Sequence, residues 1–324
     1  FAIRGPKLKS DGAINLISRE TALITNNFLL ICASVIVLIG TFYPLALELA
    51  TGIKITVGPP FFEATFNPIM GLLVIAMGIG PFMIWKRGLI PKSRHIWVFG
   101  AGITGVICFI FIIANTGLSI SALAGIATVT WLSVTILSDI VIRVRVLNRT
   151  NKYNFWQRIV HLQWSMWIAH LGVVIFLIGA LGESIFRTEA ISRMQIGEQI
   201  SIGTHKAELK SISRRAGSNF EALIAALSIS DGKNNHIGTL YPEKRIYPVE
   251  KQTTTEAAIR RKLTHDYYAV LGDGNKADGY TIRIYYKPFV SWIWVGVILM
   301  ASGAMISILL KHMINKQTST TLQS

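Results

Sequence analysis

The sequence predicts a membrane protein: an α-helical bundle of about six transmembrane helices with one small β-rich extracytoplasmic domain. Composition is the first observation behind this. Apolar residues make up 51% of the 324 residues, charged residues only 15%, and mean hydropathy is +0.48. Soluble proteins carry ~25% charged residues. The balance excludes a disordered chain and argues against a wholly cytosolic protein.

Six long apolar runs are the second observation, because each can cross about 30 Å of hydrocarbon at about 1.5 Å per residue. The expected spans are roughly Leu23–Ala50, Phe66–Trp85, Ile96–Asn115, Leu118–Val141, Leu162–Leu181 and Pro288–Leu310. They divide the chain into a five-helix transmembrane region (1–181), a β-rich domain (182–287), a final transmembrane helix (288–311) and a cytoplasmic tail (312–324).

The distribution of basic residues is the third observation. They gather before the first span and after the second, fourth and sixth, whereas the loop after the first span holds only Lys54 and the loop after the third holds none. This is the positive-inside pattern. It places both termini in the cytoplasm and 182–287 on the opposite side. The net charge of +15 therefore indicates orientation rather than nucleic-acid binding. We expect a bacterial inner membrane, with the mitochondrial inner membrane as the alternative.

The polar stretch between the fifth and sixth spans reads mostly as strand. Apolar and polar residues alternate in Gln199–Leu209 and Thr281–Tyr286, and β-forming residues cluster in Ala222–Ile229 and Tyr267–Leu271. The expected turns are Asp231-Gly232, Tyr241-Pro242, Tyr247-Pro248 and Gly272-Asp273-Gly274. A short helix is expected at Thr255–Lys262. Together these features predict a small β-barrel or β-sandwich.

His170 is the polar residue of greatest interest, because it lies near the middle of the fifth span. Desolvation there favours a neutral imidazole, whose free lone pair can coordinate a haem iron. At helical spacing its face is shared by Gln163, Met166, Trp167, Val173, Val174 and Leu177. The alternative is a histidine that hydrogen-bonds to another helix of the bundle. The residues alone leave both interpretations open.

Other polar features have simpler interpretations. Asp139 precedes Arg143 by four residues, which predicts an ion pair along one helix. The segment Val57–Phe62, with its proline pair and two phenylalanines, predicts either an aromatic platform at the interface or a rigid turn. His205, His236 and His265 lack metal-ligand spacing and are expected on the surface.

Ordered motifs along almost the whole chain resemble the CcmF/NrfE family, the haem lyase membrane subunits of cytochrome c maturation systems. They are Leu8-Lys9-Ser10, Ser18-Arg19-Glu20, Asn26-Asn27, Gly40-Thr41-Phe42-Tyr43-Pro44, Val57-Gly58-Pro59-Pro60-Phe61-Phe62, Gly78-Ile79-Gly80-Pro81, Ala169-His170-Leu171-Gly172, Leu240-Tyr241-Pro242-Glu243-Lys244-Arg245, Tyr247-Pro248, Thr255-Glu256-Ala257-Ala258-Ile259, Lys287-Pro288 and Trp292-Ile293-Trp294. Only the C-terminal half of the family is covered, because no WGxxWxWD segment occurs here.

The resemblance implies a function and a site. It implies a haem lyase acting in a complex, which receives haem from a periplasmic chaperone and supports its thioether attachment to CxxCH of apocytochrome c. His170 matches the position that this family uses as an axial ligand of a b-type haem for electron transfer. The other axial ligand would come from the missing N-terminal half, and we expect a fragment or a split gene. The implied partners are the chaperone, apocytochrome c, thiol-handling maturation subunits, that N-terminal half and quinol as a candidate electron donor.

Two other function classes stay open on the residues alone. Six spans with intramembrane polar groups are also typical of a transporter or channel subunit with an outer β-domain. A membrane anchor that only displays the β-domain is the third reading. A haem spectrum that depends on His170 would separate the first hypothesis from both.

Overall fold

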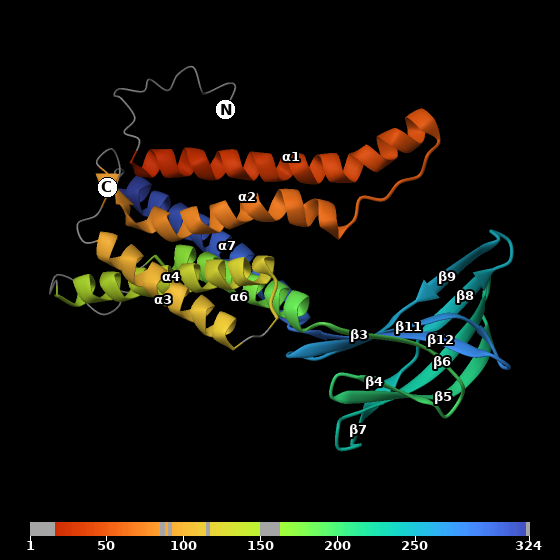
Figure 1. Ribbon diagram of the computed structural model, residues 1–324. Coiled ribbons are helices and arrows are strands. Elements are labelled where there is room, and N and C mark those ends of the chain that lie inside the picture. Colours follow the sequence, from red (N-terminus) through yellow and green to blue (C-terminus); the bar gives the residue numbers. More distant parts are fainter. Residues whose placement is uncertain (1–16, 85–87, 90–92, 115–116, 150–162, 322–324) are drawn as a thin grey trace. The chain divides into compact units, whose positions relative to one another are not determined.

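A computed structural model describes residues 17–84, 88–89, 93–114, 117–149 and 163–321 (Figure 1). Several basic residues behind the predicted orientation, among them Lys86, Arg87 and Lys152, lie outside this part of the chain. The chain forms two compact units that divide after Trp167, and each is described by itself.

The first unit is a set of long apolar helices. It contains α1 (Arg19–Thr51), α2 (Pro59–Ile79), α3 (Ser93–Ile113), α4 (Ile120–Arg149) and the first residues of α6 (Trp164–Phe186). A 3₁₀ turn, η2 (Gly80–Phe82), and the strand pair β1 (Met83–Ile84) and β2 (Gly88–Leu89) follow α2. With α7 (Val290–Thr321) of the second unit, six helices of the described chain are long and apolar enough to cross a membrane, as predicted.

The proline pair does not form a turn or a platform between two spans. Pro59 and Pro60 are the first residues of α2, where a missing backbone N–H leaves no hydrogen bond unmade. Phe61 and Phe62 pack on α1 at Gly40, where an added Cβ would lie 2.7 Å from the Phe62 Cζ atom. The sequence therefore underestimated the length of this helix at its N-terminal end.

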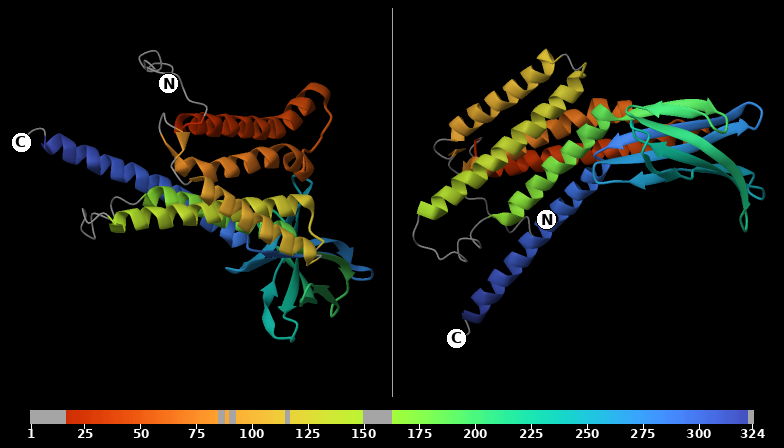
Figure 2. Two further views of the ribbon diagram at one scale, coloured as in Figure 1. Left: turned by 60° about the vertical axis from the view of Figure 1, so that its left-hand side comes forward. Right: turned by 90° about the horizontal axis from the view of Figure 1, so that it is seen from below.

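The second unit contains ten antiparallel strands in two sheets (Figures 1 and 2). One sheet has the order β10-β11-β12-β3. The other has the order β4-β5-β6-β8-β9, with β7 also paired to β6. The strands are β3 (Thr188–Met194), β4 (Gln199–Ile202), β5 (His205–Ala216), β6 (Glu221–Ser230), β7 (His236–Leu240), β8 (Glu243–Tyr247), β9 (Gln252–Glu256), β10 (Ala258–Arg261), β11 (His265–Asn275) and β12 (Gly279–Pro288).

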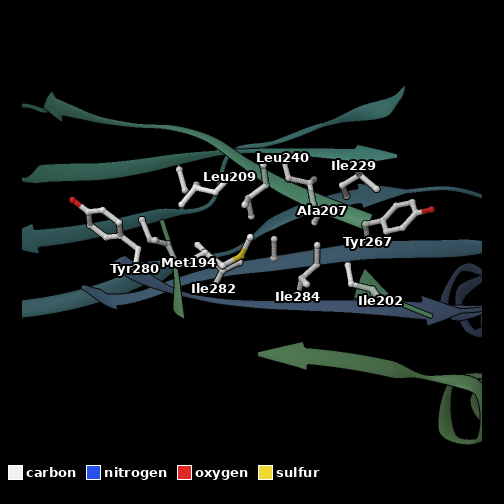
Figure 3. Packing of buried hydrophobic residues seen from close by; sticks show 14 residues of the cluster. Met194, Ile202, Ala207, Leu209, Ile229, Leu240, Tyr267, Tyr280, Ile282 and Ile284 are labelled. Atoms are coloured by element: carbon white, nitrogen blue, oxygen red, sulfur yellow. The ribbon is translucent and has the colours of Figure 1, made fainter. Parts of the chain in front are cut away.

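A shared hydrophobic core shows that the two sheets form a sandwich (Figure 3). Leu209 and Ile229 come from one sheet, Ile282 and Ile284 come from the other, and all four are fully buried. Because side chains alternate along a strand, each strand gives one set of residues to this core. The period-2 pattern that predicted the strands is thus the pattern of core contacts.

Two local predictions in this domain are wrong. Thr255–Lys262, expected as a helix, is divided between β9 and β10, whose residues pair with β8 and β11. Gly272–Gly274, expected as a turn, lies inside β11, where the register to β12 shifts between Leu271 and Gly274. The first error shows strand pairing overriding local helix propensity, and the second shows that glycines in a strand also mark bulges.

The helices α6 and α7 make close backbone contact through glycines. A Cβ atom on Gly172 would lie 2.7 Å from the Gly296 carbonyl oxygen, and one on Gly296 would lie 2.6 Å from the Gly172 oxygen. A Cβ atom on Gly179 would likewise lie 2.7 Å from the Ile293 backbone nitrogen. Small residues allow this approach, which is the usual way in which helices pack within a membrane.

Candidate functional site

His170 lies in α6, within the candidate span Trp164–Phe186. Its ring is half-buried, and its Nδ1 atom is buried from solvent. A charged imidazolium at such a position would be strongly disfavoured, so the ring is expected to be neutral. A neutral imidazole with one nitrogen available is the chemistry that a haem iron requires of an axial ligand.

The ring of His170 points away from α7. Gly172 and Gly179 mark the side of α6 that contacts α7. At about 100° per residue they lie about 160° and 180° around the helix from His170. Any group that His170 binds must therefore approach from the side of α6 opposite to α7.

One turn before His170, α6 is fixed by a buried carboxylate. The Trp167 indole Nε1–H donates to Asp139 Oδ2 of α4 at 2.8 Å, and both residues are buried. Arg143 Nε donates to Asp139 Oδ1 and Oδ2 at 2.8 and 2.9 Å, which confirms the predicted pair. Arg143 Nη2 also donates to the Pro81 carbonyl oxygen at 3.4 Å.

These donors compensate the burial of Asp139, whose exposed fraction is 3%. A buried carboxylate is stable only when it is paired and hydrogen-bonded. Trp167 is the partner that the sequence interpretation missed, because it is 28 positions away along the chain. Helical spacing predicts Trp167 on the apolar face around His170, whereas in the structure its indole N–H joins the first turn of α6 to α4.

The outer-domain histidines form the second feature of interest, and the surface prediction is wrong for two of them. His236 is exposed, but His205 and His265 are half-buried at one end of the sandwich core. The His205 ring stacks on Tyr286 with centroids 5.2 Å apart, and the His265 centroid lies 4.9 Å from that of Tyr286. Tyr267, fully buried, lies against both histidines.

Burial controls the ionisation of this aromatic cluster. It lowers the pKa of His205 and of His265, and Lys262 lowers both further. It raises the pKa of Tyr267 to about 12. Thr204 and Thr264 hydroxyls lie 3.3 and 3.0 Å from the Nδ1 atoms of the following histidines. Two histidines do not make a metal centre, and no group of three or more metal-ligating residues occurs among the described residues.

The described residues fit a haem in part. His170 offers an imidazole beside apolar residues of α6, of which Val174 is buried. The other described histidine side chains lie at the start of α3 (His95) or in the sandwich. Within the described chain, His170 is therefore the one histidine in the interior of a span, and a second histidine ligand would have to come from elsewhere.

Comparison with known proteins shows which family the chain resembles. Residues 185–288 match the family model described as the CcmF C-terminal beta-sandwich. The cytochrome c-type biogenesis protein CycK of Bradyrhizobium diazoefficiens is 34% identical over 95% of this chain and 47% of its own length. CcmF of Escherichia coli is 32% identical over 94% of this chain and 46% of its own length. The chain belongs to the CcmF/NrfE family.

A solved structure supports the same fold. The protein titled cytochrome c heme lyase CcmF matches with a TM-score of 0.66 at 19% identity, over 90% of this chain and 46% of that one. NrfE of Haemophilus influenzae is 28% identical over 95% of this chain and 47% of its own length. The chain thus spans about half the length of the curated relatives it matches.

Proposed function

We propose that this chain is part of the membrane subunit of a cytochrome c haem lyase, and that it supports thioether attachment of haem to the CxxCH motif of apocytochrome c. Its relatives are named as cytochrome c-type biogenesis proteins, and they match 94–95% of the chain. The observation that carries the proposal is an imidazole inside a span of a chain belonging to this family. The names of these relatives favour a haem lyase subunit over a transporter or channel subunit and over a membrane anchor that only displays the β-domain.

In this proposal His170 is an axial ligand of a b-type haem. Bound haem would supply a one-electron redox centre within the membrane, which serves to keep delivered haem iron ferrous. The chain's own contribution is a neutral nitrogen donor, an apolar wall that includes Val174, and a fixed helix rotation. The rotation follows from the glycine contacts with α7. The remaining axial ligand comes from the N-terminal half of the family's length.

The β-sandwich is proposed to lie on the extracytoplasmic side and to meet the soluble partners there. These are a periplasmic haem chaperone, apocytochrome c and the thiol-handling subunits, while quinol is the proposed electron source. The sequence holds only Cys32 and Cys108, and both lie in spans. In this proposal the thiols come from the apocytochrome and the partner proteins and not from this chain. Both termini are proposed to be cytoplasmic, in a bacterial inner membrane.

The test is a haem spectrum. The chain is produced together with a family N-terminal half, purified in mild detergent, and reduced. A b-type absorption spectrum is expected from the assembled pair. His170→Ala should abolish it while leaving the pair associated. His236→Ala, which changes an exposed histidine of β7, is the matched control and should keep the spectrum. An unchanged b-type spectrum in His170→Ala would reject His170 as the ligand.

The proposed orientation has a separate test. A cysteine placed at Lys233, in the exposed turn between β6 and β7, should react with a membrane-impermeant maleimide added outside intact cells, after Cys32 and Cys108 have been replaced by serine. Labelling only after the membrane is opened would place the sandwich in the cytoplasm. That outcome would exclude contact with periplasmic partners.

A further inference from the structure

A cavity of about 230 Å³ lies where the sandwich meets the first turns of α7. Strand pairing brings its polar lining together. Arg261 of β10, Asp266 of β11 and Lys287 of β12 lie side by side across the sheet, because Arg261 pairs with Asp266 and Asp266 pairs with Lys287. Ile259 of β10 and Tyr268 of β11 pair with each other two positions farther along their strands, and they form the next row of side chains on the same face.

The cavity has a positive balance. Two cations flank a single carboxylate, and that carboxylate is 5% exposed and accepts a hydrogen bond from the Lys262 backbone N–H at 3.3 Å. Within the described chain neither Arg261 nor Lys287 makes an ion pair at 4.0 Å or less. The Lys287 ammonium lies over the Tyr268 ring, 5.0 Å from its centroid, a contact that leaves its other N–H donors available.

The cavity lies at the end of a membrane span. Val290, Ser291 and Trp294 of α7 line it, and Val290–Leu309 is the candidate span. Its apolar lining is exposed in part, with exposed fractions of 47% for Ile259 and 66% for Trp294. Tryptophan is typical of the level at which a span leaves the hydrocarbon and enters the headgroup layer. Cationic and apolar groups thus meet at headgroup depth.

The loop that carries Leu263 is fixed to α7. The Trp292 Nε1–H donates to the Leu263 carbonyl oxygen at 3.1 Å, and the Ser291 hydroxyl donates to the Lys262 oxygen at 3.0 Å. The Phe289 backbone N–H donates to the Thr264 oxygen at 2.9 Å. These bonds hold the cavity and its rim in a defined shape, so little ordering is needed when a ligand enters.

We propose that this cavity binds the phosphate-bearing headgroup of an anionic phospholipid, with Arg261 and Lys287 as the phosphate partners. The exposed Ile259 and Trp294 side chains lie beside the acyl chains of the same lipid. A free phosphate would satisfy the cations but leave this apolar rim in water, whereas a lipid carries both chemistries. The site is separate from His170 and does not depend on the haem proposal.

The experiment measures lipid retention on the whole chain. The chain in neutral detergent is titrated with short-chain phosphatidylglycerol or phosphatidylcholine, and bound lipid is counted by native mass spectrometry. We expect phosphatidylglycerol to be retained in preference to phosphatidylcholine. Arg261→Gln/Lys287→Gln should weaken its binding roughly tenfold to thirtyfold, as expected for two interfacial cations. The control Arg214→Gln/Lys233→Gln removes the same charge from exposed positions elsewhere on the sandwich and should bind as the parent does.

Three outcomes would overturn the proposal. Equal retention of the two lipids would exclude an anionic headgroup site. An equal loss in the control would assign the binding to general surface charge. Competition by millimolar glycerol phosphate at the strength of the lipid would assign the cavity to a soluble phosphate instead. If the double variant fails to fold by circular dichroism, Lys287→Arg and Arg261→Glu decide: the first should retain phosphatidylglycerol and the second should lose it.

Discussion

Leu227 of β6 and Leu38 of α1 are the same residue type in opposite surroundings: the first is fully buried, and the second has an exposed fraction of 55%. In the sandwich, apolar side chains face a common core between two sheets. In the helices, and above all in α1, many large apolar side chains are exposed, and in a membrane lipid would take the place of a protein core there. Apolar residues therefore define the sandwich fold, whereas many of those in the spans indicate only that a helix crosses the membrane.

Polar residues and glycines therefore contribute much of what is specific in the contacts between spans. Asp139, with Arg143 and Trp167, joins the first turn of α6 to α4 within the first unit, while Gly172 and Gly296 bring α6 and α7 together within the second. In the sandwich the polar residues of interest are instead near the edge of a core already defined by packing, as His205 and His265 are. Substitutions in the two regions should differ accordingly.

The largest effect is expected at Asp139. Asp139→Ala leaves Arg143 and the Trp167 N–H without their carboxylate, which should lower the free energy of unfolding by about 3–5 kcal/mol. The measurement is loss of helicity during a titration of the detergent-solubilised chain with dodecyl sulfate. Glu48→Ala, which removes an exposed ion pair with Lys54, is the control and should change the free energy of unfolding by about 1 kcal/mol or less. Equal effects would contradict the role given to the buried carboxylate.

The next effect tests the apolar residues directly. Leu227→Ala creates a cavity in the sandwich core and should destabilise the domain by about 2–5 kcal/mol. Leu38→Ala deletes the same atoms from a side chain that faces outward from α1, and its effect should be far smaller. Hydrogen exchange of the strands and of the helices, measured on the same sample, reports each region. Similar losses at both sites would show that α1 is packed more tightly than its exposure indicates.

A smaller effect is expected from Gly296→Ala. The added methyl would lie 2.5 Å from the Phe176 backbone nitrogen, so α6 and α7 must separate, and we expect a loss of about 1–3 kcal/mol. Gly102→Ala in α3 meets no atom within 4 Å and should be neutral or stabilising, because alanine favours a helix by about 1 kcal/mol over glycine. The dodecyl sulfate titration distinguishes them. A stabilised Gly296→Ala would contradict the close approach.

The smallest effect concerns pH and the sandwich alone. Burial lowers the pKa of His205 and His265 in the folded state below the usual 6.5. The unfolded chain therefore binds protons first as pH falls, and stability should decrease below about pH 6.5 and be fully present above it. Hydrogen exchange of β11 and β12 at pH 7.5 and 5.5 measures this. The double variant His205→Phe/His265→Phe should flatten the dependence, and His236→Phe should not.

The site was predictable from the sequence only in part. His170 was found by its depth in a span, and its role as a haem ligand stays a prediction. The Asp139–Arg143 pair follows from helical spacing and is confirmed. Trp167 as the third member, and the packing of the His205 and His265 rings against Tyr286, could not be predicted. Those contacts join residues from different elements, whose approach depends on the complete fold.

Local pattern alone determined the six spans and most of the strands, because transfer of apolar side chains from water depends on each segment's own composition and periodicity. Tertiary structure decided that Thr255–Lys262 forms two strands, that Gly272–Gly274 is a bulge, and which face of α6 is left to His170. Each of these depends on hydrogen bonds or backbone contacts with a partner distant in sequence. No local preference of the chain contains that information.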